Sequence, residues 1–148
     1  SGLSGEIPPE IGNLVGLTYL ELTESGLSGE IPPEIGNLVN LSQLILSYNQ
    51  LSGGIPAEIG NLNNLMYLTL KSNQLTGTIP EVLCSFLNPT FTEYSNYYVS
   101  GSYKDFQFDL NSLCPPYPFC IDTTYIEQVF GINSLKHYVG IQDTTNCD

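Results

Sequence analysis

Leucine residues recur along the first half of the chain with a fixed period. Leu3, Leu27, Leu51 and Leu75 follow one another at a constant interval of twenty-four positions. These leucines open the phrases LSGEIP, LSGEIP, LSGGIP and LTGTIP, and residues 1–15 recur unchanged as residues 25–39. A constant period of this length is the signature of a repeat architecture. The first half of the chain is therefore predicted to consist of copies of one structural unit.

The hydrophobic pattern within a unit predicts a strand, then a bend and a short helical turn. Leu41, Leu44 and Leu46 follow the order LxxLxL, whose alternation is typical of a short, half-buried strand. The next segment, SGGIPAEIGNL, contains Gly and Pro residues that bend the chain before a helical turn. Each repeat therefore forms one coil, with the polar side of its strand facing solvent.

A single repeat is too small to fold alone. Burial of its apolar side chains contributes roughly 10–20 kcal/mol, whereas ordering its residues costs about 1–2 kcal/mol each. In one unit the apolar positions are Leu27, Ile31, Ile35, Leu38, Leu41, Leu44 and Leu46. Successive coils must therefore stack and share one core.

Asparagine residues occupy the end of each predicted strand. Asn49 and Asn73 are separated by one full period, and Asn111 holds the same place in a later copy of the pattern. A buried amide at a turn can satisfy backbone donors and acceptors of successive coils. Ser25 stands at this position in the first repeat and has no amide, so the asparagine ladder is expected to be weaker there.

The phrases combine into LxxLxLxxNxLSGxIPxxIGNL, which covers residues 1 to about 87. This pattern resembles the plant-type leucine-rich-repeat family, found in receptor kinases, polygalacturonase-inhibiting proteins and secreted microbial proteins. The resemblance implies an α/β solenoid: a right-handed superhelix with a parallel sheet on its concave side. It also implies a short second sheet from the SGxIP segments, 3-10 or short helical turns on the convex side, and a surface that recognises ligands.

The repeat pattern lapses after Leu83 and returns near Phe106. Leu75 and Leu113 are equivalent, but the interval between them exceeds one repeat by fourteen positions. We therefore divide the chain into leucine-rich repeats (1–88), an insertion loop (89–105), and a last strand with a C-terminal cap (106–148).

Tyrosines gather in and beside the predicted insertion: Tyr94, Tyr97, Tyr98 and Tyr103. Aromatic residues on a loop can form a contact surface. The alternative, which the sequence favours, is that they pack over the last coil as cap segments commonly do.

All four cysteines lie in the C-terminal half: Cys84, Cys114, Cys120 and Cys147. An even number clustered at a solenoid end indicates disulfides and secretion. The stretches LCPPYPFC and QDTTNCD resemble the cysteine-bearing caps of some secreted microbial members of the family. Aligning Cys120 with the preceding repeat places it level with Val82, near Cys84, so we predict Cys84–Cys120 and Cys114–Cys147. The other two connectivities stay open.

Charge and composition narrow the range of partners. The chain has 15 acidic and 3 basic residues, giving a net charge of −12 that repels nucleic acid and anionic lipid. No apolar stretch has the length of a membrane span. Together with the cysteines, this predicts an extracellular or cell-surface protein.

The sequence offers no set of residues for catalysis and none for a metal or a cofactor. His137 is the only histidine and no CxxC pair occurs, which argues against a zinc site. Glu21 and Glu24 could pair, but they lie on one strand and its exit, without a partner base or a closed pocket. The expected class is therefore a binding protein and not an enzyme.

The polar side of the predicted sheet is the leading candidate for a binding surface. If the coils stack in register, this side holds three columns of residues: Tyr19, Gln43 and Tyr67; Glu21, Ile45 and Thr69; Thr23, Ser47 and Lys71. Gln107 and Asp109 of the last strand extend the second and third columns. We call this set the concave face. Its mixture of aromatic, polar and acidic groups favours recognition of a protein, peptide or glycan. The alternative is a merely solvated face.

Two further expectations concern the surface. Asn40-Leu41-Ser42 is the only sequon that can be glycosylated, because Asn88-Pro89-Thr90 has proline in its middle position. The first coil has no predicted cap, so its apolar residues and strand edge are exposed unless further repeats precede it or another subunit covers them. Head-to-tail stacking of subunits would make a filament, which is the alternative function.

Overall fold

Three kinds of element alternate along the chain and together build one coil. The computed structural model describes residues 4–85, 105–107 and 112–113. One sheet contains β1 (Gly5–Glu6), β3 (Leu27–Glu30), β5 (Gln50–Gly53), β7 (Gln74–Gly77) and β9 (Ser112–Leu113). The other contains β2 (Tyr19–Glu21), β4 (Gln43–Ile45), β6 (Tyr67–Thr69) and β8 (Asp105–Gln107). The 3-10 helices are η1 (Pro9–Asn13), η2 (Pro33–Asn37), η3 (Ala57–Asn61) and η4 (Glu81–Ser85).

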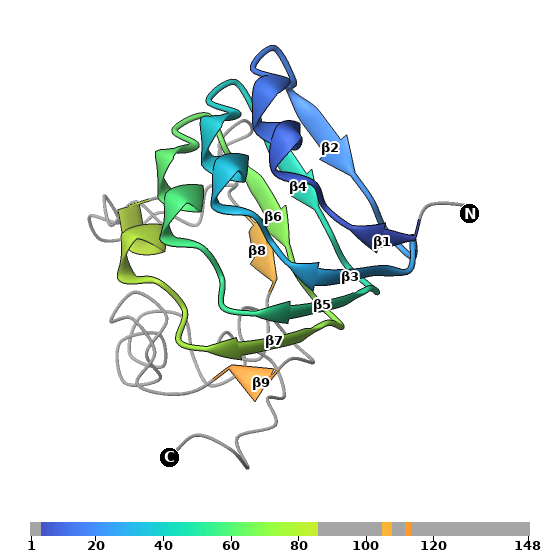
Figure 1. Cartoon of the computed structure of the whole chain (residues 1–148). Coiled ribbons are helices and arrows are strands. Elements are labelled where there is room, and N and C mark those ends of the chain that lie inside the picture. The colour runs from blue at the N-terminus through green and yellow to red at the C-terminus, as the bar shows by residue number, and fades with distance from the viewer. Residues whose placement is uncertain (1–3, 86–104, 108–111, 114–148) are drawn as a thin grey trace, which may run out of the picture.

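Both sheets are parallel, and each strand pairs with its counterpart in the next coil. The strand orders are β1-β3-β5-β7-β9 and β2-β4-β6-β8, so the chain passes from one sheet to the other and back through a 3-10 helix (Figure 1). This arrangement confirms the predicted solenoid with two sheets and short helical turns.

The pairing register identifies where extra residues enter the chain. Ile45 pairs with Thr69, one full period further on, whereas Thr69 pairs with the more distant Gln107. The second sheet agrees, because Gly53 pairs with Leu75 and Gly77 pairs with Leu113. The connection from β6 to β8 is therefore fourteen positions longer than the one from β4 to β6, and the register is unchanged. β8 begins at Asp105.

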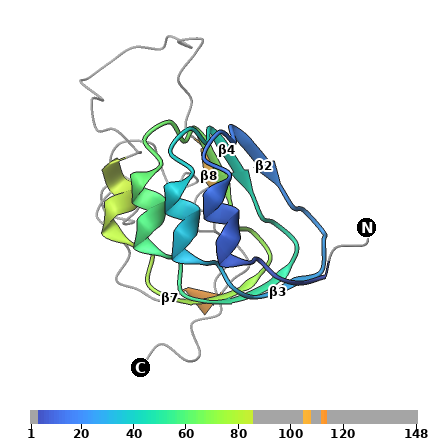
Figure 2. The same cartoon turned by 45° about the horizontal axis from the view of Figure 1, so that its top comes forward.

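The 3-10 helices stack side by side and form the wall opposite the sheet of β2, β4, β6 and β8 (Figure 2). A proline in the extended conformation directly precedes each of the first three helices: Pro8 before η1, Pro32 before η2 and Pro56 before η3. Glycine allows the helices to approach closely, since a β-carbon on Gly12 would lie 2.7 Å from the carbonyl oxygen of Glu34.

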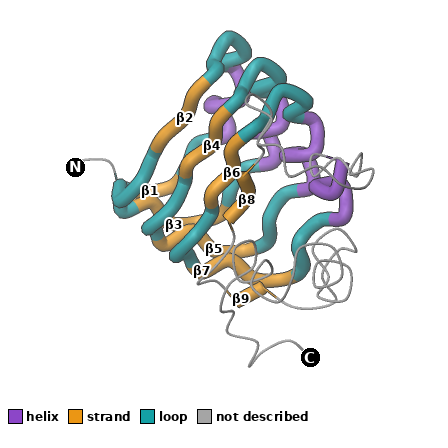
Figure 3. The backbone as a smooth tube through the Cα atoms, turned by 180° about the vertical axis from the view of Figure 1, so that it is seen from behind, coloured by secondary structure: helices purple, strands orange, loops and turns teal. Residues whose placement is uncertain are grey.

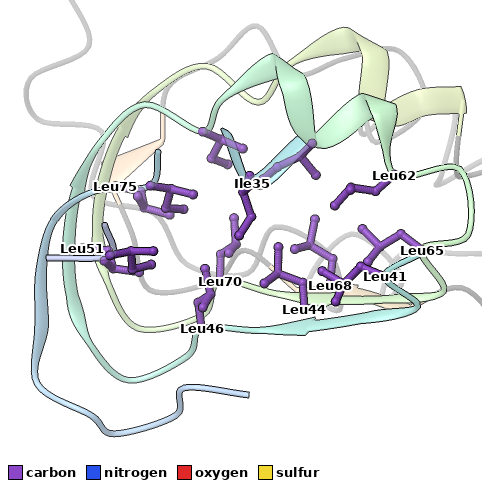
Figure 4. Packing of buried hydrophobic residues seen from close by; sticks show 14 of the residues in the cluster. Ile35, Leu41, Leu44, Leu46, Leu51, Leu62, Leu65, Leu68, Leu70 and Leu75 are labelled. Atoms are coloured by element: carbon purple, nitrogen blue, oxygen red, sulfur yellow. The ribbon is translucent and has the colours of Figure 1, made fainter. Parts of the chain in front are cut away.

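The apolar side chains of successive coils form one continuous core between the sheets and the helices (Figure 4). All seven positions predicted for one unit, from Leu27 to Leu46, are buried. The first coil differs, because Ile11, Leu17, Leu20 and Leu22 are only partly buried, whereas their counterparts Ile35, Leu41, Leu44 and Leu46 are completely buried. Complete burial of these positions therefore requires a neighbouring coil on both sides.

The amide of Asn49 joins its own coil to the preceding one. Its Oδ1 accepts the backbone N–H groups of Ser25 (3.0 Å) and Leu27 (3.1 Å), and its Nδ2 donates to the carbonyl of Leu22 (2.7 Å). The same Nδ2 also donates to the carbonyl of Leu46 within its own coil (3.0 Å). One side chain thus satisfies backbone groups on both sides of the junction.

Asn73 repeats this bonding one coil later. It accepts the backbone N–H of Leu51 (3.1 Å) and donates to the carbonyls of Leu46 (3.0 Å) and Leu70 (2.9 Å). Ser25, in the equivalent place of the first coil, donates only to Thr23 (3.3 Å) through its hydroxyl. The hydroxyl therefore makes fewer bonds than the amides of the later coils.

Candidate recognition face

The sheet of β2, β4, β6 and β8 aligns the first two predicted columns of the concave face. Tyr19 pairs with Gln43 and Gln43 with Tyr67, which aligns the first column. Glu21 pairs with Ile45 and Ile45 with Thr69, and Gln107 continues this second column from β8. Figure 3 shows the four strands side by side from behind. Pairing between successive coils therefore sets the residues of each column in line across the sheet.

At one end of this face, a tyrosine and a carboxylate are joined. The Tyr19 hydroxyl donates a hydrogen bond to Oε2 of Glu21, and the Thr23 hydroxyl lies 3.5 Å from Oε1. The hydrogen bond to Glu21 raises the pKa of Tyr19, and the negative charge of Glu21 adds to the effect. Since Tyr19 is 46% exposed, its ring remains open to a partner while its hydroxyl is held in place.

Two predicted contact residues are buried. Ser47 and Thr69 are each only 4% exposed, and their hydroxyls lie 2.6 Å apart in a mutual hydrogen bond. Both are short side chains, and Thr69 has the longer Tyr67 and Lys71 on either side of it along the chain. Ser47 and Thr69 therefore offer almost no surface to a partner, although the sequence predicted both as contact residues of the concave face.

The turn that leaves each strand adopts a left-handed backbone. Glu24, Tyr48 and Ser72 occupy equivalent places in three coils and have φ values of 51°, 57° and 55°. For residues other than glycine, this conformation costs roughly 1–2 kcal/mol. The coils impose it, because Glu24 N–H bonds to the Ser47 carbonyl (3.2 Å) and Tyr48 N–H bonds to the Lys71 carbonyl (2.9 Å).

Tyr48 is a surface residue that the sequence reasoning did not select. Its side chain is 49% exposed, although it directly precedes the bonded Asn49. The available signal was its alignment with Glu24 one period earlier, because glutamate is a residue type that rarely lies in a core.

A second set of asparagine bonds lies where the helices lead into the strands. Asn40 and Asn64 are exposed, and their Nδ2 atoms donate to the carbonyls of Val15 and Val39, each at 2.9 Å. Each bond again connects one coil to the preceding one. Asn40 is the asparagine of the sequon, so the modifiable nitrogen lies at the surface with one of its two N–H groups used.

Several predicted residues lie outside the described part of the chain. These are Asp109, Asn111, Cys114, Cys120, His137, Cys147 and the tyrosines Tyr94, Tyr97, Tyr98 and Tyr103. Cys84 falls in η4 and Gln107 in β8, but only their backbone is described. The disulfide pairing therefore stays a prediction.

Within residues 4–85 and the two short strands that follow, no group of three or more His, Cys, Asp or Glu side chains is placed to hold a metal ion. In the same described part of the chain, the helices are all too short or too polar to cross a bilayer.

Known proteins share both the repeat and the coil geometry. The model of the Leucine Rich Repeat family matches residues 16–38, 40–62 and 64–86. A comparison with curated proteins found no significant match. The repeats from residue 16 to residue 86 are therefore leucine-rich repeats, which confirms the family that the sequence pattern indicated.

Solved structures of receptor ectodomains resemble the chain closely. The Arabidopsis receptor kinase HAESA ectodomain, in complex with an extended IDA peptide hormone, is 32% identical with a TM-score of 0.69, and the match covers 94% of this chain and 20% of that one. HAESA with IDA and the co-receptor SERK1 gives 31% identity, a TM-score of 0.67, and coverage of 98% and 21%.

A shorter relative gives a similar result. In the BIR3–SERK2 complex from Arabidopsis thaliana, the matched chain is 34% identical with a TM-score of 0.60, and the match covers 80% of this chain and 56% of that one. The chain thus spans little more than half of this structure and about a fifth of the HAESA ectodomain.

Proposed function

We propose that the chain is an extracellular recognition module that binds a peptide or protein partner on its concave face. The observation that carries this proposal is the alignment, across adjoining coils, of aromatic, aliphatic, amide and acidic side chains that all keep some exposed surface. Tyr19 and Glu21 are exposed, and Gln43, Ile45 and Tyr67 are half-buried on the same surface.

The physical properties of these residues suit a protein partner. Tyrosine supplies a large contact area and loses little side-chain entropy when it is ordered. Tyr19 is already held by Glu21, which lowers the entropic cost of binding further. The rigid sheet beneath them fixes the spacing between contacts, as a recognition surface requires.

The structural relatives support the same class. HAESA was solved with the IDA peptide hormone and with a co-receptor, and BIR3 with SERK2. These are complexes with peptides and proteins, so a partner of this class is the one we propose for the concave face and an extracellular or cell-surface location for the chain. A glycan is a less favoured ligand.

The test is a peptide-display selection against the folded chain, followed by calorimetry with the selected peptides. Tyr67→Ala and Tyr19→Ala should each weaken binding about fivefold to thirtyfold, as expected for truncation of an aromatic contact. Val39→Ala is the control, because Val39 is exposed away from this sheet, just after η2. Equal affinity for the wild type and both tyrosine variants would place the binding site elsewhere.

A second candidate function rests on the first coil. Its residues Leu17, Leu20 and Leu22 are only partly buried, and Leu14 is 52% exposed whereas its counterpart Leu38 in the next coil is completely buried. A further coil would cover them, supplied either by the same polypeptide or by a second copy. Sedimentation over a range of concentrations separates these cases: growing polymers favour a self-assembling scaffold, whereas a constant mass argues against it.

A further inference from the structure

Tyr48 keeps a bulky aromatic side chain in a backbone conformation that suits glycine. Its φ is 57°, its ring is 49% exposed, and its backbone N–H is bonded to the carbonyl of Lys71. The backbone bonds need no tyrosine ring, because Glu24 and Ser72 hold the same conformation without one. The ring is therefore dispensable for the turn and available for contact.

The coil that precedes Tyr48 presents acidic side chains on this surface. Glu24 holds the equivalent place in the preceding coil, and its backbone N–H donates to the carbonyl of Ser47, the residue before Tyr48 (3.2 Å). Glu24 is exposed, and Glu21 is exposed on the adjoining strand β2. The single basic residue in the described part of the chain, Lys71, belongs to the following coil, where its carbonyl accepts the backbone N–H of Tyr48 (2.9 Å).

An exposed aromatic ring beside carboxylates is the arrangement that attracts a cationic side chain. The face of the ring carries partial negative charge and binds Arg or Lys, and an adjoining carboxylate adds to the attraction. The net charge of −12 draws the same kind of partner from a distance. A carboxylate or phosphate group would be repelled by Glu21 and Glu24.

We propose that Tyr48 and Glu24 form a cation-binding edge of the concave face, and that the partner segment received there carries an arginine or lysine side chain. This proposal rests on the proposed recognition function and adds the chemistry of its partner. Tyr19 and Tyr67 contact the segment at the start of the strands, and Tyr48 contacts it at the strand exit.

The experiment uses two acetylated hexapeptides, one of alternating arginine and glycine and one in which neutral citrulline replaces arginine. Amide resonances of the labelled chain are followed by NMR during titration. The arginine peptide should shift the resonances of Tyr48 and Glu24, and the citrulline peptide should not. Equal shifts with both peptides would overturn the proposal, because the charge would then be irrelevant.

Variants separate the ring from the turn. Tyr48→Gly should weaken arginine-peptide binding about twofold to fivefold, the range of an exposed cation–π contact, while Tyr48→Phe should retain it. Tyr48→Gly should also lower the unfolding equilibrium constant a few-fold, because the left-handed conformation suits glycine. Loss of binding together with gain of stability is the expected signature.

Ser72→Gly is the matched control, since Ser72 has the same left-handed backbone and a buried hydroxyl that lacks a hydrogen-bond partner. It should raise stability and leave binding unchanged. Equal weakening by Ser72→Gly and Tyr48→Gly would show that the turn matters and the ring does not, which would refute the proposal.

The two proposals fail in different ways. If Tyr67→Ala abolishes binding of display-selected peptides while Tyr48→Gly and Glu24→Gln have no effect on either peptide class, the recognition function stands and the cation-binding edge does not. If the arginine peptide responds to Tyr48→Gly but no selected peptide responds to Tyr67→Ala, the edge binds cations but the concave face is not the site of recognition.

Discussion

A β-carbon placed on Gly36 would lie 2.5 Å from the carbonyl oxygen of Glu58 in the next coil. The glycine therefore determines how closely η2 and η3 can stack. The nearest atom belongs to the backbone, which cannot move away as a flexible side chain could. The same relationship joins Gly12 to Glu34, at 2.7 Å, one coil earlier. The close spacing of the 3-10 helices thus depends on the lack of a side chain at Gly12 and Gly36.

Gly36→Ala is expected to lower the free energy of unfolding by about 1–3 kcal/mol, because the helices must separate to admit the methyl group. Chemical denaturation followed by circular dichroism measures the change. Gly54→Ala is the control: its β-carbon would meet no atom within 4 Å, so the variant should gain up to about 1 kcal/mol through a less flexible unfolded chain. Similar losses in both variants would contradict the close-approach argument.

Ser25→Asn is expected to stabilise the first coil by about 1 kcal/mol. The new amide can donate to the carbonyls of Leu22 and Thr23, as Asn49 does to those of Leu46 and Ser47, and each added bond contributes roughly 0.5–1.5 kcal/mol. Slower hydrogen exchange of the amides near residue 27 would show it. Asn49→Ala should act in the opposite direction and leave carbonyls of two coils without a donor.

Tyr19 should ionise above the ordinary tyrosine pKa of 10.0, because it donates a hydrogen bond to Glu21. The folded state holds this proton more tightly than the unfolded chain. Its contribution to stability is therefore complete below the ordinary pKa and is lost as the pH rises through the folded pKa. The difference in phenolate absorbance between wild type and Tyr19→Phe isolates this residue.

Glu21→Gln should lower the titration midpoint of Tyr19, since the charge of the acceptor is removed. The same absorbance difference, measured in the Glu21→Gln background, provides the comparison. A midpoint that does not move would show that the carboxylate has no influence on the phenol.

Asn40 is expected to carry a glycan when the chain is made in a glycosylating secretory host. The side chain is exposed, and its Nδ2 uses one N–H for the carbonyl of Val15, which leaves the other for the sugar bond. Asn40→Gln should reduce the intact mass by one glycan. Asn64→Gln removes the equivalent bond to Val39 but lies in no sequon, so it should change stability alone.

The coil architecture could be predicted from the sequence because the period appears directly in the residues. The constant spacing of the leucines determined which strands pair, and the longer connection before Gln107 followed from counting to Leu113. The core followed from the same pattern, since Ile35, Leu41 and their counterparts occupy fixed places in each unit. Because the chain repeats, aligning its sequence with itself is enough to predict which strands pair and which residues form the core.

The details of the concave face could not be predicted in this way. Alternation indicates which side of a strand a residue faces but not how deeply it lies, so the buried hydroxyl pair of Ser47 and Thr69 was missed. Tyr48 was missed for another reason. Its left-handed backbone is imposed by bonds to the next coil, and tyrosine gives no local signal of it, as glycine or asparagine would.

The pairing of Thr69 with Gln107 shows that contacts between coils determine the strand register, and that the number of residues connecting two strands does not. Lengthening a connection costs little, about 0.6 kcal/mol for each doubling of a flexible loop. The added residues lie between η4 and β8, so this connection is a natural graft point. Peptides of different length and sequence could be exchanged there, and a family of variants with new specificities could be built on one unchanged frame.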